Sequence, residues 1–315
     1  MKVKFWGTRG SIPVPGRSTL IHGGNTSSIQ VTSYDNDQIF LDAGSGLREA
    51  GIEFMKHPSS NEIHLFMSHF HWDHVLGLPF FILFYDESFH IHVYGLPACP
   101  PSASVDFGRR AESRLWREQA GMANNQNNIE GVIDSLIGPP LFPITKNEFK
   151  AKVTYSNISP DSTYEIGNVK IKTFQVNHQC CTLAYKIEEK NRSFVYVTDN
   201  EIKYSRLDLN SLENDIAEHN VKMIEFCRGA DYLVHDTTYT LNDYLQKVGW
   251  GHSNNISAAI LASLAEVKNL VLFHYDPEYN DEKIESLLKG TNSLLKRLSG
   301  NVNCLSSKDG MELEF

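Results

Sequence analysis

Four side chains that commonly bind metal ions lie within six residues of this chain, directly after Glu62–Met67, whose alternating pattern predicts a strand. They are His69, His71, Asp73 and His74. Imidazole and carboxylate are the natural ligands of zinc and related divalent ions. A regular strand or helix cannot bring all four to one tetrahedral ion, but a loop between a strand and a helix can share them between two ions. We therefore predict that His69 and His71 bind one ion and that Asp73 and His74 bind a second.

Strands dominate each half of the chain, and helices are expected near the end of each half. The expected strands are Val3–Gly7, Ser28–Ser33, Gln38–Asp42, Glu62–Met67, His90–Tyr94, Val153–Ile158, Val169–Asn177, Thr182–Glu188, Ser193–Asp199, Tyr232–Thr237 and Leu270–Tyr275. The expected helices are Gly46–His57, Ser104–Ala120, Leu212–Cys227, Asn254–Ala265 and Asp281–Leu298, followed by a terminal hairpin around Lys308–Gly310. This order predicts two sheets packed face to face with helices outside.

Residues 97–150 differ in character from the rest, because prolines bracket both ends of the segment and an asparagine-rich run lies inside it. We interpret 97–150 as an elaboration within one domain spanning 1–315, and as a lid or a subunit contact. Arg110, Arg114 and Arg117 would share a helix face there. They could contact substrate phosphates or an acidic partner, although surface pairing with the nearby Glu112 and Glu118 is the favoured interpretation.

The formal net charge is −9, from 29 Lys and Arg against 38 Asp and Glu. Binding of long nucleic acids depends largely on neutralising phosphates, so this balance predicts no long nucleic acid partner. Two bound divalent cations would offset about four of the negative charges. Met1–Ser11 lacks the apolar region of a signal peptide, and the longest apolar run, Leu78–Phe84, is too short to cross a bilayer. We expect a cytoplasmic protein without a membrane partner.

Beyond the histidine motif, several short blocks resemble the branch of the metallo-β-lactamase superfamily that contains ribonuclease Z and the PhnP-like cyclic phosphodiesterases. These blocks are Gly23–Ser27, Leu41–Gly46, Val197–Asp199 and Phe273–Asp276. The resemblance spans Val3 to Asp276 except for the 97–150 elaboration. It implies an α+β fold, a four-layer αββα sandwich with the site at one edge of the sheets, and a homodimer would be typical of the family.

The resemblance also implies three further ligands, each after an apolar strand. His178 would join His69 and His71 on the first ion, His274 would join Asp73 and His74 on the second, and Asp199 would bridge both. The implied cofactor is two divalent ions, with Zn²⁺ favoured over Mn²⁺ or Fe²⁺.

One departure from the family pattern follows His178. Relatives carry small residues there, whereas this chain has Gln179-Cys180-Cys181. A thiol at this position could bind or shield an ion, or could simply pack, which is the favoured interpretation.

Two close divalent ions, about 3.5–4 Å apart in such sites, activate a water as a nucleophile and clamp the electrophile's oxygens. Asp73 would both bind a metal and orient that nucleophile. The leaving group needs a separate acid, and the resemblance implies His252, just before the Asn254–Ala265 helix. Asp236 would orient His252, although relatives carry Glu at that place. The alternatives are a surface histidine and a capping aspartate.

We therefore predict a binuclear metal-dependent hydrolase, and within that class a phosphodiesterase for a small phosphodiester such as a cyclic nucleotide. One alternative is a transfer-RNA 3′-processing endonuclease of the ribonuclease Z kind, for which we expect a basic, glycine-rich arm that the sequence does not show. An acyl hydrolase, such as a thioesterase or lactonase, is a second alternative. A metal-stabilised binding scaffold without catalysis is a third.

Overall fold

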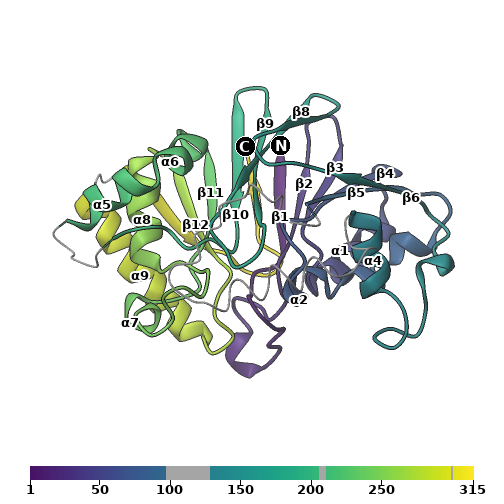
Figure 1. The fold of residues 1–315 in the computed structure, drawn as a ribbon, viewed down its shortest axis with the longest axis horizontal. Coiled ribbons are helices and arrows are strands. Elements are labelled where there is room, and N and C mark those ends of the chain that lie inside the picture. The colour runs from purple at the N-terminus through teal and green to yellow at the C-terminus, as the bar shows by residue number, and fades with distance from the viewer. Residues whose placement is uncertain (97–127, 206–210, 299–300) are drawn as a thin grey trace.

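Two seven-stranded β-sheets face each other in the computed structural model, with helices on their outer sides (Figure 1). The structure describes residues 1–96, 128–205, 211–298 and 301–315. The first sheet has the strand order β14-β1-β2-β3-β4-β5-β6, and the second has the order β13-β12-β11-β10-β9-β8-β7. The predicted α+β four-layer sandwich is confirmed.

The strands are β1 Lys2–Gly7, β2 Ser28–Thr32, β3 Gln38–Leu41, β4 Glu62–Phe66, β5 His90–Gly95, β6 Lys152–Asn157, β7 Thr163–Ile166, β8 Val169–Gln175, β9 Leu183–Glu189, β10 Arg192–Val197, β11 Tyr232–Asp236, β12 Asn269–Phe273, β13 Asn303–Ser306 and β14 Glu312–Glu314. The α-helices are α1 Gly46–Lys56, α2 Trp72–Val75, α4 Ile129–Leu136, α5 Leu212–His219, α6 Val221–Cys227, α7 Leu241–Tyr244, α8 Asn255–Leu264 and α9 Asp281–Leu298. Short 3₁₀ helices are η1 Arg17–Thr19, η2 Leu78–Phe80, η3 Ile82–Tyr85 and η4 Lys146–Glu148.

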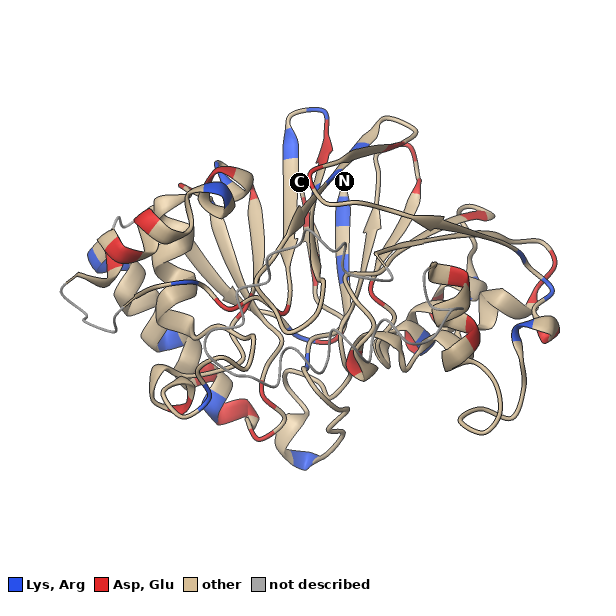
Figure 2. Ribbon diagram, in the orientation of Figure 1, with Lys and Arg blue, Asp and Glu red and all other residues tan. Residues whose placement is uncertain are grey.

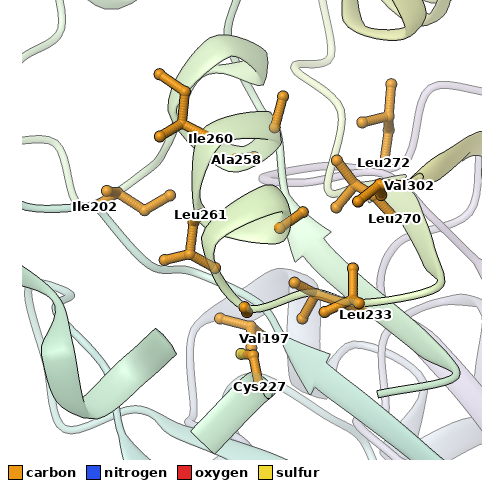
Figure 3. Packing of buried hydrophobic residues seen from close by; sticks show 14 of the residues in the cluster. Val197, Ile202, Cys227, Leu233, Ala258, Ile260, Leu261, Leu270, Leu272 and Val302 are labelled. Atoms are coloured by element: carbon orange, nitrogen blue, oxygen red, sulfur yellow. The ribbon is translucent and has the colours of Figure 1, made fainter. Parts of the chain in front are cut away.

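Three buried apolar clusters separate the four layers. The central cluster fills the space between the sheets and includes Phe5, Phe66 and Phe273. A second cluster packs α1 and α4 on the first sheet, and a third packs α5, α6, α8 and α9 on the second. In the third cluster, the small side chains of α8, such as Ala258, allow the helix to lie close to the strands (Figure 3).

Parallel strands bring the polar residues of the site to one edge of the sandwich. The strands β3 to β6 run parallel in one sheet, as do β10 to β13 in the other. The carboxyl ends of parallel strands lie together, and ligands of α/β sheets bind at this edge. The chain leaves β4, β10 and β12 there and continues into His69, Asp199 and His274.

The predicted terminal hairpin is wrong. The turn around Lys308–Gly310 connects two different sheets, because β13 pairs with β12 whereas β14 pairs with β1. The turn's amide groups bond to the N-terminal region: Asp309 donates to the carbonyl of His22 (2.9 Å), and Gly310 to that of Phe5 (2.8 Å). Turn residues predict a reversal of the chain, but they do not say which strand each arm pairs with.

Other differences concern single elements. The predicted helix Leu212–Cys227 is divided into α5 and α6 at Asn220, whose side-chain amide donates to the carbonyls of Ile216 and Lys203 and so competes with the helical ladder. The short strand β7 was not predicted.

Part of the 97–150 elaboration is described. The helix α4 within it was not predicted, and Ile129 and Ile133 of that helix are buried in the core of the first sheet. The predicted helix Ser104–Ala120, with Arg110, Arg114 and Arg117, lies outside the described residues. The role of the elaboration as a lid or subunit contact stays a prediction. Among the described residues, none of the helices combines the length and apolar character that crossing a bilayer requires.

Candidate metal centre

The first predicted ligand group is assembled from two loops. His69, His71 and His178 each place a ring nitrogen, and Cys180 its sulfur, within 4.8 Å of one another. His71 Nδ1 lies 3.1 Å from His178 Nε2. His69 is buried, and its Nε2 has no hydrogen-bond partner. A buried polar atom without a partner is unfavourable, so this nitrogen fits a metal-ligand atom.

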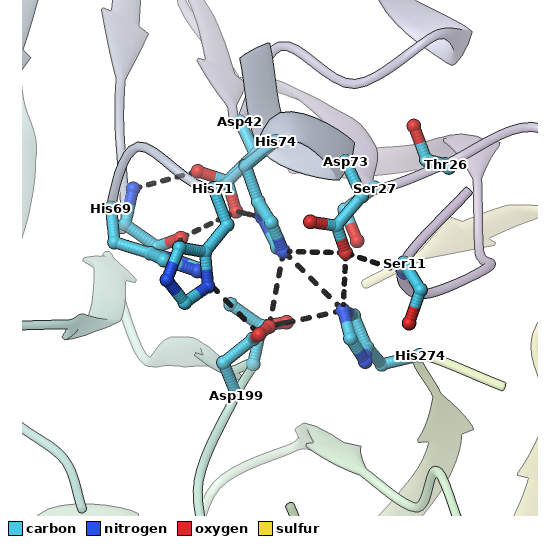
Figure 4. Close-up of polar contacts among 12 residues, drawn as sticks. Ser11, Thr26, Ser27, Asp42, His69, His71, Asp73, His74, Asp199 and His274 are labelled. Atoms are coloured by element: carbon cyan, nitrogen blue, oxygen red, sulfur yellow. Dashed lines mark hydrogen bonds and ion pairs between the residues drawn. The ribbon is translucent and has the colours of Figure 1, made fainter. Parts of the chain in front are cut away.

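The second predicted ligand group is fully buried (Figure 4). Asp73, His74, Asp199 and His274 place ligand atoms within 4.8 Å of one another. His74 Nε2 and His274 Nε2 are 3.3 Å apart, and each lies 3.1 Å from Asp199 Oδ1. Four donors thus converge on one small volume, as the ligands of an ion do.

Asp199 joins the two groups, one oxygen to each. Its Oδ1 lies beside His74 and His274, whereas its Oδ2 lies 3.5 Å from Nε2 of both His69 and His178. This is the arrangement expected of a carboxylate that bridges two ions.

The electrostatics of the second group also fit bound cations. Burial alone would raise the pKa values of Asp73 and Asp199, but the adjacent imidazoles outweigh burial and hold both well below their ordinary range. Burial would lower the pKa of His74, and the two carboxylates with Asp42 instead raise it well above its usual value. The two buried carboxylates require positive charge, which the His74 imidazolium supplies in part and which a bound cation would supply in its place.

Each of four predicted histidine ligands has one ring nitrogen fixed by a neighbour and the other directed to its group. His69 Nδ1 lies 3.0 Å from Ser68 Oγ, and His274 Nδ1 lies 3.1 Å from Thr238 Oγ1. The corresponding partners are Asp42 Oδ2 for His74 (2.8 Å) and the Gly251 carbonyl for His178 (2.9 Å). Such contacts fix the tautomer and orientation of a metal ligand.

Asp42 is a supporting residue to which sequence reasoning gave no role. Its buried carboxylate accepts hydrogen bonds from the Ser68 amide (2.6 Å) and hydroxyl (2.8 Å), and from Tyr196 Oη (2.8 Å), as well as contacting His74. Its place in the Leu41–Gly46 block, after an apolar strand, was the available signal.

Three residues of the centre have left-handed backbone conformations. The φ values are +60° for Asp42, +47° for Asp199 and +63° for His274. Each of them lies at the end of a strand, and non-glycine residues adopt this conformation at a cost of order 1–3 kcal/mol. The packed sheets and hydrogen bonds hold these backbones in place and so aim the side chains.

Glu201 supports the first group through the backbone, and sequence reasoning missed it. Its carboxylate accepts hydrogen bonds from Tyr244 Oη (2.7 Å) and from the amides of Gly249 (2.8 Å) and Gly251 (2.9 Å). Gly251 in turn accepts from His178. Gly251 has a φ of +84°, and a Cβ there would lie 2.4 Å from His178 Nδ1, so only glycine fits. The available sequence signal for this supporting role was the position of Glu201, an acidic residue two positions after Asp199.

The predicted acid and its orienting carboxylate meet beside both groups. His252 Nδ1 lies 2.8 Å from Asp236 Oδ2, and Asp236 also accepts from the Asn200 amide (3.1 Å) and the Thr238 hydroxyl (2.8 Å). The His252 ring centroid is 5.1 Å from those of His178 and His274. Burial lowers the pKa of His252, but the Asp236 carboxylate outweighs burial and raises that pKa to about 9.

Cys180 lies closer to the first group than the favoured packing interpretation implied. Its sulfur is within 4.8 Å of a ring nitrogen of all three histidines, and it is 3.6 Å from Thr182 Oγ1. Burial raises the pKa of the thiol to about 12. The position of the sulfur beside the three histidines therefore fits metal ligation as well as packing.

No family model matches the chain. Ribonuclease Z of Haloarcula marismortui is 25% identical over 89% of this chain and 87% of its own length. Ribonuclease Z of Oceanobacillus iheyensis is 23% identical over 92% of this chain and 94% of its own length.

Solved structures resemble the whole chain. The metallo-β-lactamase fold protein YhfI from Bacillus subtilis aligns over 100% of this chain and 99% of its own, with a TM-score of 0.65 and 18% identity. A diphosphatase of the PhnP family covers 100% and 97%, with a TM-score of 0.59 and 17% identity. The short form of human tRNase Z covers 100% and 99%, with a TM-score of 0.55 and 17% identity.

The chain therefore has the metallo-β-lactamase fold. Its predicted resemblance to the ribonuclease Z-like and PhnP-like branch is confirmed, as is the predicted enzyme class, a metal-dependent hydrolase.

One expectation must be corrected. The net charge predicted no long nucleic acid partner, but relatives that match along most of the chain are named ribonucleases, and a structural neighbour is a tRNase. Net charge sums the whole surface and does not describe any one face. Figure 2 shows Lys and Arg interspersed with Asp and Glu over both halves, so the chain is not uniformly acidic.

Proposed function

We propose that this protein is a phosphodiesterase that cleaves RNA, with the 3′ end of transfer-RNA precursors as its substrate. One observation supports the assignment as a phosphodiesterase. Asp199 is shared by two ligand groups that lie beside the His252–Asp236 pair. The resemblance to ribonucleases Z over most of both chains supports RNA as the substrate.

In this proposal His69, His71 and His178 would hold the first ion, Asp73, His74 and His274 would hold the second, and Asp199 would contribute to both. When bound, two such ions supply a nucleophile from water at neutral pH and neutralise phosphate charge. Zn²⁺ suits the imidazole-rich donors best.

Residues of the chain orient the ligands and supply the proton for the leaving group. The Ser11 amide donates to Asp73 Oδ2 (2.7 Å) and holds that carboxylate facing His274. Asp236 accepts from His252 Nδ1, which leaves Nε2 to donate its proton to the leaving oxygen as the P–O bond breaks. The His252 side chain is 14% exposed, so a bound substrate can reach it, whereas Asp236 is inaccessible and can act only through His252. His252 is the proposed general acid, and Asp236 is a positioning residue.

The test compares substrates on the metal-loaded enzyme. We expect cleavage of a 3′-extended transfer-RNA precursor, with kcat/KM that falls steeply as salt rises, because RNA binding releases counterions. Bis-p-nitrophenyl phosphate serves as a generic phosphodiester. Turnover of the generic ester without precursor cleavage would overturn the RNA substrate and keep the phosphodiesterase.

A small phosphodiester such as a cyclic nucleotide is the second candidate. The resemblance of the fold to a diphosphatase of the PhnP family supports it, with a TM-score of 0.59. Its hydrolysis should depend weakly on salt, so the same two-salt comparison separates the two candidates. Activity confined to thioesters or lactones would overturn both.

A further inference from the structure

Another cluster of potential metal ligands, outside the metal centre, lies at the opposite end of the first sheet, where β4 and β5 begin. Glu62 begins β4, His90 begins β5, and the two residues pair in the parallel ladder, as His64 and His92 do. Residues two apart on a strand share a face, so His90 and His92 both face the Glu62 side chain. Glu62 Oε2 lies 2.8 Å from His92 Nε2 and 3.2 Å from His90 Nδ1.

This group is separate from the metal centre. Glu62 and His69 are seven positions apart along β4 and the loop after it. An extended chain rises about 3.3 Å per residue, so the two ends are separated by roughly 20 Å. The group shares none of the seven ligands proposed for the centre.

The chemistry of the group suits a borderline divalent cation. Two imidazole nitrogens and one carboxylate oxygen come within 4.8 Å of one another. The rings of His90 and His92 have centroids 3.9 Å apart, so two protonated rings would repel strongly. A cation bound by one nitrogen of each ring and by the Glu62 carboxylate would make three attractive contacts.

The surroundings already orient these donors. Thr154 on the adjacent strand β6 lies 2.8 Å from His92 Nδ1, which directs His92 Nε2 toward Glu62. This is the same kind of support that the histidines of the metal centre have. His64, stacked on His92 at 4.8 Å, adds no positive charge, since burial and His92 lower its pKa to about 4.

We propose that Glu62, His90 and His92 form a third metal site, for Zn²⁺ or a similar first-row divalent ion, with water completing the coordination. The site joins the beginnings of β4 and β5 and, through Thr154, lies against β6. It is structural and independent of the proposed function. Its ion ties together parallel strands at the end of the sheet that the catalytic metals do not reach.

The experiment counts Zn²⁺ in four proteins: the natural chain, Glu62→Gln, His92→Gln and the control His219→Ala. Each is equilibrated with excess Zn²⁺, dialysed against metal-free buffer and measured by elemental analysis. His219 is a matched control, because it is an exposed histidine beside a single carboxylate, Asp215 (3.2 Å), with no second imidazole in that pair. Glu62 is half-exposed, so Glu62→Gln should fold even if His92→Gln does not.

We expect both site variants to hold one Zn²⁺ fewer per chain than the natural protein, and the control to hold the same number. Hydrolysis of bis-p-nitrophenyl phosphate by Glu62→Gln should match the natural rate. With the metal centre loaded with Zn²⁺ first and one equivalent of Cu²⁺ added as the probe, electron paramagnetic resonance should show nitrogen couplings that His92→Gln weakens. Equal Zn²⁺ content in the natural protein and Glu62→Gln, or equal loss in His219→Ala, would overturn the site.

Discussion

The two ligand groups of the candidate centre share Asp199 but are built differently. The second group has two carboxylates and two imidazoles, all buried, and is supported by the buried Asp42. The first has three imidazoles and a nearby thiol, of which His71 and Cys180 are partly exposed. Its support is a glycine loop anchored by Glu201. The difference indicates that the second group is part of the core and would bind an ion mainly through charge, whereas the first would depend on a loop and on imidazole donors.

Removing the shared ligand should have the largest effect. Asp199→Ala takes one donor from each group and removes the charge opposite His74 and His274. We expect the metal centre to hold one ion or none in place of two, and hydrolysis to become undetectable. Elemental analysis in the Glu62→Gln background, which lacks the proposed third site, and a bis-p-nitrophenyl phosphate assay measure this. A variant whose centre retained two ions would show that Asp199 does not bridge the groups.

The general acid lies beside both groups and should belong to neither. We expect His252→Ala to lower kcat by about 10²–10⁴-fold, as loss of a positioned acid does, with unchanged metal content. Asp236→Asn should lower kcat less, because the His252 ring remains and only the charge that orients it and raises its pKa is lost. If His252→Ala loses metal, His252 supports the ligands, and the division between acid and ligands is wrong.

Changing the support of each group separately tests the comparison directly. Loss of an outer support lowers metal affinity by about 10–100-fold. We expect Asp42→Asn to weaken the ion of the second group and Glu201→Gln that of the first. Competition with a chromophoric chelator gives the two affinities. If both variants weakened the binding of the same ion, the two groups would not be supported independently.

Cys180 should distinguish the groups spectroscopically. If its thiolate binds the ion of the first group, the Co²⁺-substituted enzyme should show a near-ultraviolet sulfur-to-metal band that Cys180→Ser abolishes. We expect only a small loss of activity, with a shift of metal preference away from Zn²⁺, because sulfur is the softest donor. Cys227, a buried thiol in a helix–sheet core, provides the control for an inert cysteine. An unchanged spectrum in Cys180→Ser would restore the packing interpretation.

The sequence predicted the layers and the candidate ligands better than the residues that support them. The family resemblance implied His178, Asp199 and His274 as ligands, each after an apolar strand, and the structure brings the three side chains together with the histidine motif. Asp42 and Glu201 are ordinary acidic residues whose role depends on partners far along the chain. The pairing of β14 with β1 was missed for the same reason, since a turn does not specify its distant neighbours.

Asp309 has a buried carboxylate beside the N-terminal segment that contains Ser11. We expect the charge of this carboxylate to change the stability of the fold and not the chemistry of the metal centre. Asp309 Oδ2 accepts a hydrogen bond from the Asn25 backbone amide (3.1 Å), and the backbone amide of Asp309 donates to the carbonyl of His22. Burial raises the pKa of Asp309 from 3.8 to about 7, although Asn25 and Arg9 oppose the rise.

Since the folded chain keeps this proton up to about pH 7 and the unfolded chain releases it near pH 4, the free energy of unfolding should fall as pH rises between them. Asp309→Asn cannot ionise, and its side-chain carbonyl can still accept from Asn25. We therefore expect this variant to be more stable than the natural protein at about pH 8, by on the order of a few kcal/mol, and nearly equal to it at about pH 4. Urea unfolding of both proteins across this range measures the difference, with Asp35→Asn, at an exposed position, as control. A difference that stayed constant with pH would show that Asp309 is ionised in the folded protein, and that Arg9 compensates its charge.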